Sequence, residues 1–245
     1  MPSLDAIFKA YDVRGTVPDQ LDPELAHAIG VGFAAFAREE ADGRGESVTR
    51  VLMARDMRPS GVELSAVFAD GVRSQGLDVV DLGLGSTDLL YFASGSMAAP
   101  GVMFTASHNP AQYNGAKFCL SGARPVGEDT GLGRIREVGE ASLAGSVPAA
   151  ATTGTISSLD VLGAFADHVR SFVDVSSLAP LQIVADTANG MGGLIVPAVF
   201  SSLPFQLEVM YGELDGTFPN RPADPIQPAN SEDLRRRVVE AGADV

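Results

Sequence analysis

Three consecutive polar side chains, those of Ser107, His108 and Asn109, follow a nearly continuous apolar run and precede Pro110. They place a hydroxyl, an imidazole and a carboxamide side by side. A hydroxyl acts as a nucleophile when it is exposed at the end of an element, held rigidly and surrounded by groups that stabilise developing charge. The same residues also fit a simple turn that begins at Asn109 and Pro110 and is capped by Ser107.

His108 is the immediate neighbour of Ser107, so its role depends on the shape of the loop that carries both residues. Adjacent side chains of an extended segment point in different directions, and we therefore expect no Ser–His dyad here. His108 is better placed to meet an oxygen of a substrate or of a phosphate group.

Two cationic side chains, those of Lys117 and Arg14, are candidates for binding phosphate. Lys117 is one of the chain's two lysines and lies on the next apolar segment, where its ammonium suits a point charge on phosphate. Arg14 follows Tyr11 in a polar loop near the N-terminus, and its guanidinium suits the fork geometry of phosphate binding. The alternative for Arg14 is a solvated surface arginine.

Other motifs are more ambiguous. Arg55, Asp56 and Arg58 follow a predicted strand, where phosphate binding and a surface ion pair compete on equal terms. Residues 83–88 lack the third glycine of a dinucleotide loop, and the glycines of residues 186–193 suit a tight turn from a strand into a helix. The sequence contains no CxxC or HExxH spacing, which excludes the common zinc sites.

The elements that must position these residues alternate between helical and strand patterns. The predicted strands cover residues 48–56, 77–83, 101–107, 115–121, 181–186 and 206–211. The predicted helices cover residues 21–37, 62–76, 132–141, 159–173 and 192–203, and a last helix runs from a cap at Ser231 to a stop at Gly242. This alternation predicts two consecutive α/β domains with mixed, mostly parallel sheets covered by helices. Ligands of such sheets gather beyond the carboxyl ends of the strands.

The domain boundary is predicted from a stretch of small and polar residues without a period. We assign residues 1–145 to the first domain, 146–157 to a linker and 158–245 to the second domain. The residues after Gly242 read as the start of a further strand, so we expect a second domain that is incomplete at its C-terminus. A frayed tail is the alternative.

The composition restricts the partners of the chain. With a formal net charge of -14, nucleic acid and anionic membranes are disfavoured, although a local positive cleft still suits a phosphorylated small molecule. Cys119 is the only cysteine, so no internal disulfide can form. The sequence shows no signal-peptide pattern and no apolar run of membrane-spanning length, and we expect a cytoplasmic protein. The oligomeric state stays open.

The motifs together resemble those of the α-D-phosphohexomutases, and within them the phosphomannomutase/phosphoglucomutase group. The resemblance rests on FKAYDVRG, ARDMRPSG, TASHNP followed by YNGAKF, DTANGMGG, and FPNRPADP followed by a helix and AGAD, all in the family's order. It implies an enzyme that interconverts hexose 1-phosphate and hexose 6-phosphate, of mannose or glucose, through a phosphoserine and a bisphosphorylated intermediate.

The same resemblance implies roles for individual residues. It implies catalytic roles for Ser107, His108, Lys117 and Arg14, and substrate contacts for Tyr11, Arg14, Asn109 and Lys117. Ser107 would be the phosphoserine, Lys117 a proton-transfer partner or phosphate contact, and His108 an orienting group. The implied cofactors are Mg²⁺, which Ser107 would ligate through its phosphate, and a hexose 1,6-bisphosphate as activator and intermediate. The implied partner is a phosphorylated hexose.

The family's aspartate-rich metal loop, DGDxDR, normally comes just after the stretch that here ends at Val245. We therefore expect the remaining Mg²⁺ ligands beyond Val245, and an N-terminal portion that is inactive alone. One alternative is a non-catalytic module that binds sugar phosphates or partners and retains the serine loop. A serine hydrolase is disfavoured, because no GxSxG elbow surrounds Ser107. The preferred hexose cannot be read from these residues.

Overall fold

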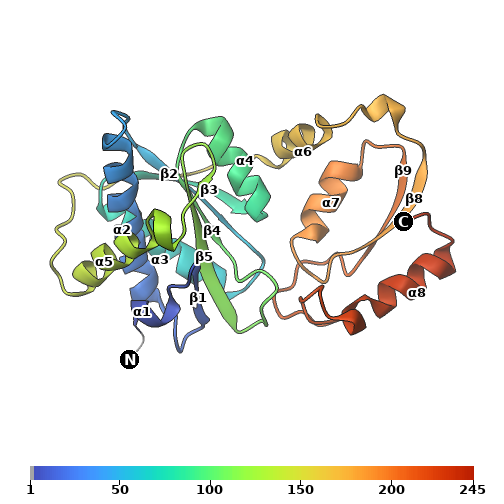
Figure 1. Ribbon diagram of the computed structural model, residues 1–245, viewed down its shortest axis with the longest axis horizontal. Helices are drawn as coiled ribbons and strands as arrows, with labels where there is room; N and C mark the ends of the chain where they lie inside the picture. Colours follow the sequence, from blue (N-terminus) through green and yellow to red (C-terminus); the bar gives the residue numbers. More distant parts are fainter. Residues whose placement is uncertain (1–2) are drawn as a thin grey trace. The chain divides into compact units, whose positions relative to one another are not determined.

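A computed structural model describes residues 3–245 (Figure 1) and divides them into two compact units. The first unit holds the residues up to Ala106 together with Gln112–Asp160. The second holds Ser107–Ala111 together with Val161–Val245. Each unit combines helices with a sheet, as the alternating sequence pattern predicts. None of the helices within residues 3–245 is both long and apolar enough to cross a membrane.

The first unit is built on a mixed sheet. Its strands are β1 (Val13–Thr16), β2 (Arg50–Arg55), β3 (Asp78–Leu84), β4 (Gly101–Phe104), β5 (Tyr113–Leu120), β6 (Arg124–Pro125) and β7 (Ile156–Ser158). They follow the order β1-β5-β4-β2-β3-β7, with β6 beside β5. The pairings of β2 with β3 and β4, and of β3 with β7, are parallel, whereas β5 runs antiparallel to β1, β4 and β6.

Helices cover both faces of this sheet. They are α1 (Leu4–Ile7), α2 (Pro23–Asp42), α3 (Ser60–Ser74), α4 (Thr87–Met97) and α5 (Leu132–Leu143), with a 3₁₀ turn at Glu128–Thr130. Figure 1 shows α2, α3 and α5 together on one side of the strands and α4 on the other. Helix α4 is absent from the sequence predictions, because its segment mixes glycine and serine with apolar residues. Its signal is Ser86, whose hydroxyl caps the helix by accepting from the Leu89 amide.

Four phenylalanines join these helices to the sheet. Phe33 of α2 and Phe118 of β5 have ring centroids 4.8 Å apart, and Phe68 of α3 packs edge-on against Phe104 of β4 at 5.3 Å. All four side chains are buried. Helices α2 and α3 approach so closely that a Cβ atom on Gly30 would lie 2.2 Å from the Phe68 carbonyl oxygen. This packing fixes the strands on which the candidate site residues stand.

The observed end of the first unit lies later in the chain than the segment expected to link the domains. Residues 156–158, which the prediction divides between the linker and the second domain, form β7 and pair in parallel with β3. The physical reason is a set of backbone hydrogen bonds. The Val79 amide donates to the Thr155 carbonyl, and the Leu159 amide donates to the Asp81 carbonyl. The contacts of the first unit therefore extend to Asp160.

The second unit has a parallel pair of strands, β8 (Leu181–Asp186) and β9 (Phe205–Met210). Its helices are α6 (Leu162–Arg170), α7 (Gly192–Phe200) and α8 (Glu232–Ala241), with 3₁₀ turns at Val175–Ser177 and Pro228–Ser231. Past Gly242, the Asp244 amide donates to Gln182 of β8, and the Val184 amide donates to Val245. Ser231 precedes α8 as predicted, but its side chain does not cap the helix. Its hydroxyl donates to the Pro228 carbonyl at 2.9 Å instead.

Candidate functional site

The Ser107 hydroxyl is exposed three residues after β4, which ends at Phe104 instead of continuing to Ser107 as the sequence predicts. The backbone of Ser107 has φ +53° and so lies in the left-handed region. For a residue other than glycine this conformation costs on the order of 1–3 kcal/mol and is most often retained at functional sites.

The expectation that Ser107 and His108 form no dyad, because their side chains point in different directions, is wrong in its geometry. The Oγ atom of Ser107 lies 3.3 Å from Nδ1 of His108, within hydrogen-bond distance. The expectation assumed an extended loop, whereas the left-handed backbone of Ser107 turns the two side chains toward each other. Both residues are exposed, and Asn109 beside them is half-buried. The loop therefore presents a hydroxyl and an imidazole together.

A cationic cluster is built on β1 and β5, which are antiparallel neighbours. Oδ2 of Asp12 accepts a hydrogen bond from Nη2 of Arg14 at 2.6 Å and another from Nζ of Lys117 at 2.9 Å. The side chains are mostly buried, with exposed fractions of 11% for Asp12, 21% for Arg14 and 26% for Lys117. Arg14 is therefore not a solvated surface arginine. One carboxylate therefore holds two cations close together.

Asp12 is a site residue that the sequence reasoning missed. Its signal was its place between Tyr11 and Arg14 in the motif KAYDVRG, where an acid beside a cation is the expected partner. Tyr11 itself is 80% exposed and extends into solvent. The structure therefore joins two of the predicted residues, Arg14 and Lys117, and does so through a third that was not predicted.

The strand pairing relates Lys117 to the segment that leads into the serine loop. In the antiparallel register of β4 and β5, Lys117 lies opposite Met103, four residues before Ser107. One step further along the chain, the Thr105 amide donates to the Gly115 carbonyl at 3.1 Å. The backbone between Lys117 and the start of the loop is thus a continuous hydrogen-bonded ladder.

Within the motif at Arg55, Asp56 and Arg58, the pair of Asp56 and Arg58 is structural. Both readings of Arg58, as a phosphate ligand and as part of a surface pair, are wrong because its side chain is fully buried. Its Nε atom donates to Asp56 at 3.2 Å, and its Nη1 atom donates to the carbonyl of Tyr113 at the start of β5. Desolvation lowers the pKa of Arg58, and the charge of Asp56 opposes that shift. This pair ties the end of β2 to β5.

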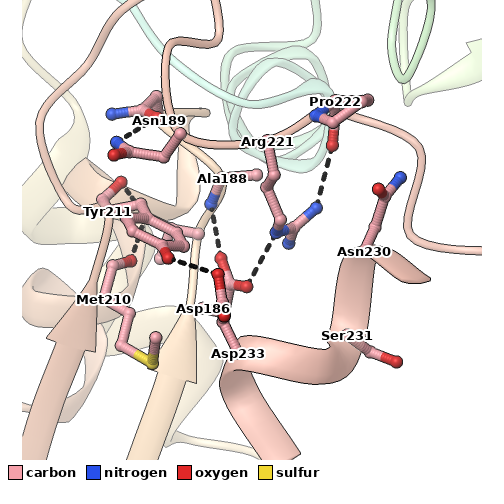
Figure 2. A network of polar contacts seen from close by, with 12 residues as sticks. Asp186, Ala188, Asn189, Met210, Tyr211, Arg221, Pro222, Asn230, Ser231 and Asp233 are labelled. Atoms are coloured by element: carbon pink, nitrogen blue, oxygen red, sulfur yellow. Dashed lines mark hydrogen bonds and ion pairs between the residues drawn. The ribbon is translucent and has the colours of Figure 1, made fainter. Parts of the chain in front are cut away.

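In the second unit, a network of polar contacts surrounds the end of β8 (Figure 2). The carboxylate of Asp186, which closes that strand, accepts from the Ala188 amide at 2.9 Å and from Nε of Arg221 at 2.7 Å. The start of α7, which follows, requires glycine, since a Cβ atom on Gly193 would lie 2.1 Å from the Gly212 carbonyl oxygen. Arg221 is a second residue that the sequence reasoning missed, although the motif FPNRPADP contains it.

A cavity of about 680 Å³ opens in the second unit as its contacts define it. Its lining consists of His108, Asn109, Pro110 and Ala111 from the serine loop, and of residues 217–224. Arg221 contributes the arginine of this lining and Asp224 the carboxylate. A volume of this size accommodates a small polar ligand.

The described residues do not by themselves form a magnesium site. Within residues 3–245, no group of three or more His, Cys, Asp or Glu side chains is arranged to hold a metal ion. A phosphate on Ser107 would add oxygen donors, which Mg²⁺ prefers, but an octahedral ion needs several more ligands.

Comparison with known proteins gives matches over both units. Residues 5–140 match the sequence profile of phosphoglucomutase/phosphomannomutase alpha/beta/alpha domain I, and residues 163–245 match that of domain II. Together the two profiles cover most of the chain. In both cases the matched segment carries motifs discussed above, including the serine loop in the first and the turn after β8 in the second.

Relatives with curated names extend this similarity. The chain is 39% identical over 240 residues to the phosphohexose mutases of Xanthomonas campestris pv. campestris, covering 97% of this chain and 50% of that protein. It is 34% identical over 240 residues to a phosphoglucomutase of Neisseria meningitidis serogroup B, covering 98% and 49%. A phosphomannomutase of Salmonella typhimurium is 33% identical over 246 residues, with 97% and 51% covered.

A solved structure shows the same architecture. A phosphoglucomutase/phosphomannomutase family protein of Burkholderia thailandensis superposes with a TM-score of 0.83 at 32% sequence identity. The match covers 99% of this chain and 52% of that one. The chain therefore spans about half the length of the relatives it matches.

Proposed function

The chain belongs to the phosphoglucomutase/phosphomannomutase family, and from this premise we propose that it carries the phosphoryl-bearing serine of a phosphohexomutase. The proposed reaction interconverts hexose 1-phosphate and hexose 6-phosphate, with mannose or glucose as the sugar. The observation that carries the proposal is the exposed Ser107 hydroxyl in the loop that follows β4, where Ser107 has a left-handed backbone and its Oγ atom lies 3.3 Å from Nδ1 of His108.

In the proposed mechanism, phosphorylated Ser107 transfers its phosphoryl group to the free hydroxyl of the hexose monophosphate. The bond between phosphorus and Oγ breaks as a bond to the sugar oxygen forms, and the product is a hexose 1,6-bisphosphate. The other phosphoryl group of this intermediate then returns to Oγ. The sugar hydroxyl loses a proton in the first transfer and Oγ gains one. In the second transfer Oγ loses that proton, and the other sugar oxygen, which loses its phosphoryl group, gains one. Lys117 is the proposed proton-transfer partner, through Nζ, or a direct phosphate contact.

Phosphoryl transfer depends mainly on positioning and on neutralising the charge of the transferred group. Arg14 and Lys117 supply that charge in the proposal, and Asp12 holds both cations at 2.6 and 2.9 Å. His108 and Asn109 orient the loop, while Tyr11, which is 80% exposed, is available to a sugar. Preorganised charges of this kind stabilise a transition state without reorganising during the reaction.

The activity of the whole protein is part of the proposal, because the chain spans about half the length of its relatives. Mg²⁺ and a hexose 1,6-bisphosphate activator belong to the same proposal. A phosphate on Ser107 would give the ion an oxygen ligand, and the other ligands would come from outside the described residues. The ion would neutralise charge on the transferred group. We expect the 245-residue chain alone to be inactive as a mutase.

A coupled mutase assay tests the proposal on the protein encoded by the complete reading frame that contains this chain. With Mg²⁺ and glucose 1,6-bisphosphate present, it should convert mannose 1-phosphate or glucose 1-phosphate to the 6-phosphate. Ser107→Ala should lower kcat/KM by on the order of 10³-fold or more, because it removes the atom that carries the phosphoryl group. The matched control is Ser96→Ala, an exposed serine on α4 whose hydroxyl bonds only within its own helix.

Intact-mass spectrometry provides a second readout, since the wild-type protein should carry a phosphoryl group that Ser107→Ala lacks. Turnover that survives in Ser107→Ala would refute the proposal. Binding of glucose 1,6-bisphosphate by the complete protein, with neither turnover nor phosphorylation, would instead support a non-catalytic sugar-phosphate-binding module.

A further inference from the structure

Asp186 is a buried carboxylate at the end of β8, with only 1% of its side chain exposed. Both of its oxygens are used, because Oδ1 accepts from the Ala188 amide and Oδ2 accepts from Nε of Arg221. Figure 2 shows the two side chains facing each other from the end of the strand and from the Pro-rich loop. A buried charge is tolerated when it is paired in this way. The position of the Arg221 guanidinium is therefore set by a rigid strand end.

Arg221 uses only part of its hydrogen-bonding capacity on the protein. Its Nε atom donates to Asp186 at 2.7 Å, and its Nη1 atom donates to the Pro222 carbonyl at 3.0 Å. No residue in the described part of the chain accepts a hydrogen bond from Nη2. A planar guanidinium held on one side in this manner presents its other side in a fixed direction.

The loop around Arg221 is anchored as well. Nδ2 of Asn220 donates to Oδ1 of Asn189 at 2.9 Å, and Nδ2 of Asn189 donates to the Glu213 carbonyl at 3.0 Å. The Asp215 amide donates to the Asn189 carbonyl. These bonds fasten the loop to the turn after β8, next to Asp186. Arg221 is thus preorganised by its side-chain partner and by its backbone.

Arg221 lines a cavity that has few charged residues. Among the residues that line the space of about 680 Å³, Arg221 is the sole arginine or lysine, and Asp224 is the sole carboxylate. An anion approaching a chain of net charge -14 needs a local positive group. An arginine that lines this cavity and keeps an unused Nη2 donor is well suited to a phosphate group.

We propose that Arg221, positioned by Asp186, binds a phosphate group of the ligand that occupies this cavity, with Nη2 as the donor. The inference rests on the proposed function, because that function supplies a phosphorylated hexose as the ligand. Asp186 acts here through Arg221 as a positioning residue. The matched comparison is Arg237, which also pairs with a carboxylate of the second unit but does not line the cavity: its Nε and Nη2 atoms donate to Glu208 at 2.7 and 2.8 Å.

The test is an NMR titration of the 245-residue chain with inorganic phosphate, and separately with glucose 1,6-bisphosphate, at constant ionic strength. The side-chain Nε–H resonance of Arg221 should shift with saturation, while that of Arg237 stays in place. Arg221→Gln should weaken phosphate binding by about 10- to 100-fold, the loss expected for a hydrogen bond between charged groups. Arg221→Lys should keep part of the affinity, and Arg237→Gln should leave it within about twofold.

Asp186→Asn distinguishes positioning from simple charge. It retains Arg221, but we expect weaker phosphate binding and a changed Nε–H chemical shift before any ligand is added. Glu208→Gln, the matched variant, should affect neither. Thermal unfolding identifies variants that fail to fold. If Arg221→Gln and Asp186→Asn do not fold, titrations of the wild type and of Arg221→Lys still test whether Arg221 binds phosphate.

Two results would overturn the inference. One is an Arg221 resonance that does not move at saturating ligand, or that moves no more than that of Arg237. The other is folded Arg221→Gln that binds phosphate as tightly as the wild type. Neither result bears on Ser107: turnover that depends on Ser107 with no response at Arg221 would leave the proposed function intact. Absent turnover with a specific response at Arg221 would refute only the mutase proposal.

Discussion

Lys117 Nζ lies 2.9 Å from Oδ2 of Asp12, the same oxygen atom that accepts from Arg14. The two cations stand on neighbouring strands, 103 residues apart in sequence by the difference of their numbers, and share one mostly buried carboxylate oxygen. Without Asp12 the two positive charges would repel each other. The arrangement keeps the two cations close together, where both can contact one multiply charged anion.

Asp12→Asn should lower the free energy of unfolding of the 245-residue chain by about 1–3 kcal/mol, because an amide cannot neutralise the two cations. Urea denaturation measures the change. The control is Asp5→Asn, which removes a carboxylate bonded to Arg136 at 2.6 Å but exposed to solvent. We expect a change within about 0.5 kcal/mol there. Equal effects of the two variants would contradict a special role for the Asp12 oxygen.

Breaking the buried pair of Arg58 and Asp56 should cost more stability than breaking a surface pair. Arg58→Met should lower the free energy of unfolding by about 3–5 kcal/mol, since it leaves the Asp56 carboxylate buried without its charged partner. Arg44→Met serves as the control, because Arg44 pairs with Glu40 and Glu46 at the surface. Denaturation curves in urea give both values. A loss below about 1 kcal/mol for Arg58→Met would show that Asp56 readily finds water or another partner.

The close approach of α2 and α3 should be intolerant of a methyl group. Gly30→Ala should lower the free energy of unfolding by about 1–3 kcal/mol or more, because the new Cβ atom would lie 2.2 Å from the Phe68 carbonyl oxygen. Gly133→Ala on α5 is the matched helical control, since its Cβ atom would meet nothing within 4 Å. It should raise stability by about 0.5–1 kcal/mol through helix propensity. The difference in thermal midpoint between the two variants measures the effect, and midpoints that shift alike would contradict it.

Cys119 should be unreactive in the folded chain. Burial raises the pKa of its thiol, so the native protein keeps the proton at pH values where the unfolded chain releases it. The stabilising contribution of this group is complete below the unfolded pKa and is lost as pH rises through the folded pKa. Reaction of Cys119 with Ellman's reagent at mildly alkaline pH should therefore be limited by the rate at which the folded chain opens and exposes the thiol. Immediate reaction of the native chain at the rate seen in denaturant would contradict this.

The regular elements were predictable because their signals are local. The strand predicted at residues 181–186 matches β8 (Leu181–Asp186), and the helix predicted at residues 21–37 overlaps α2 (Pro23–Asp42). Helix α4 was missed because its segment has little periodic contrast. The exposed serine after an apolar strand was also predictable, since a nucleophile at a strand end has a recognisable pattern.

The site's geometry was only partly predictable. The burial of Arg58 and the contact between Ser107 and His108 both contradict the local interpretation. The burial of Arg58 depends on which other parts of the chain pack over it. The contact between Ser107 and His108 depends on the left-handed φ angle of Ser107, which no neighbouring glycine indicates in the sequence. Arg221 was missed because its carboxylate partner lies 35 residues earlier, at the end of another element.

By itself, the sequence determined the alternating elements, the family resemblance and the residue types at the candidate site, because these depend on patterns within a few residues of one another. Only the tertiary structure decided which charges meet. Asp12 holds Arg14 and Lys117 because the antiparallel pairing of β1 and β5 brings distant residues together. Asp186 orients Arg221 because a loop folds back over the end of β8. Electrostatic interactions depend on distance in space, and that distance is set by packing and strand register.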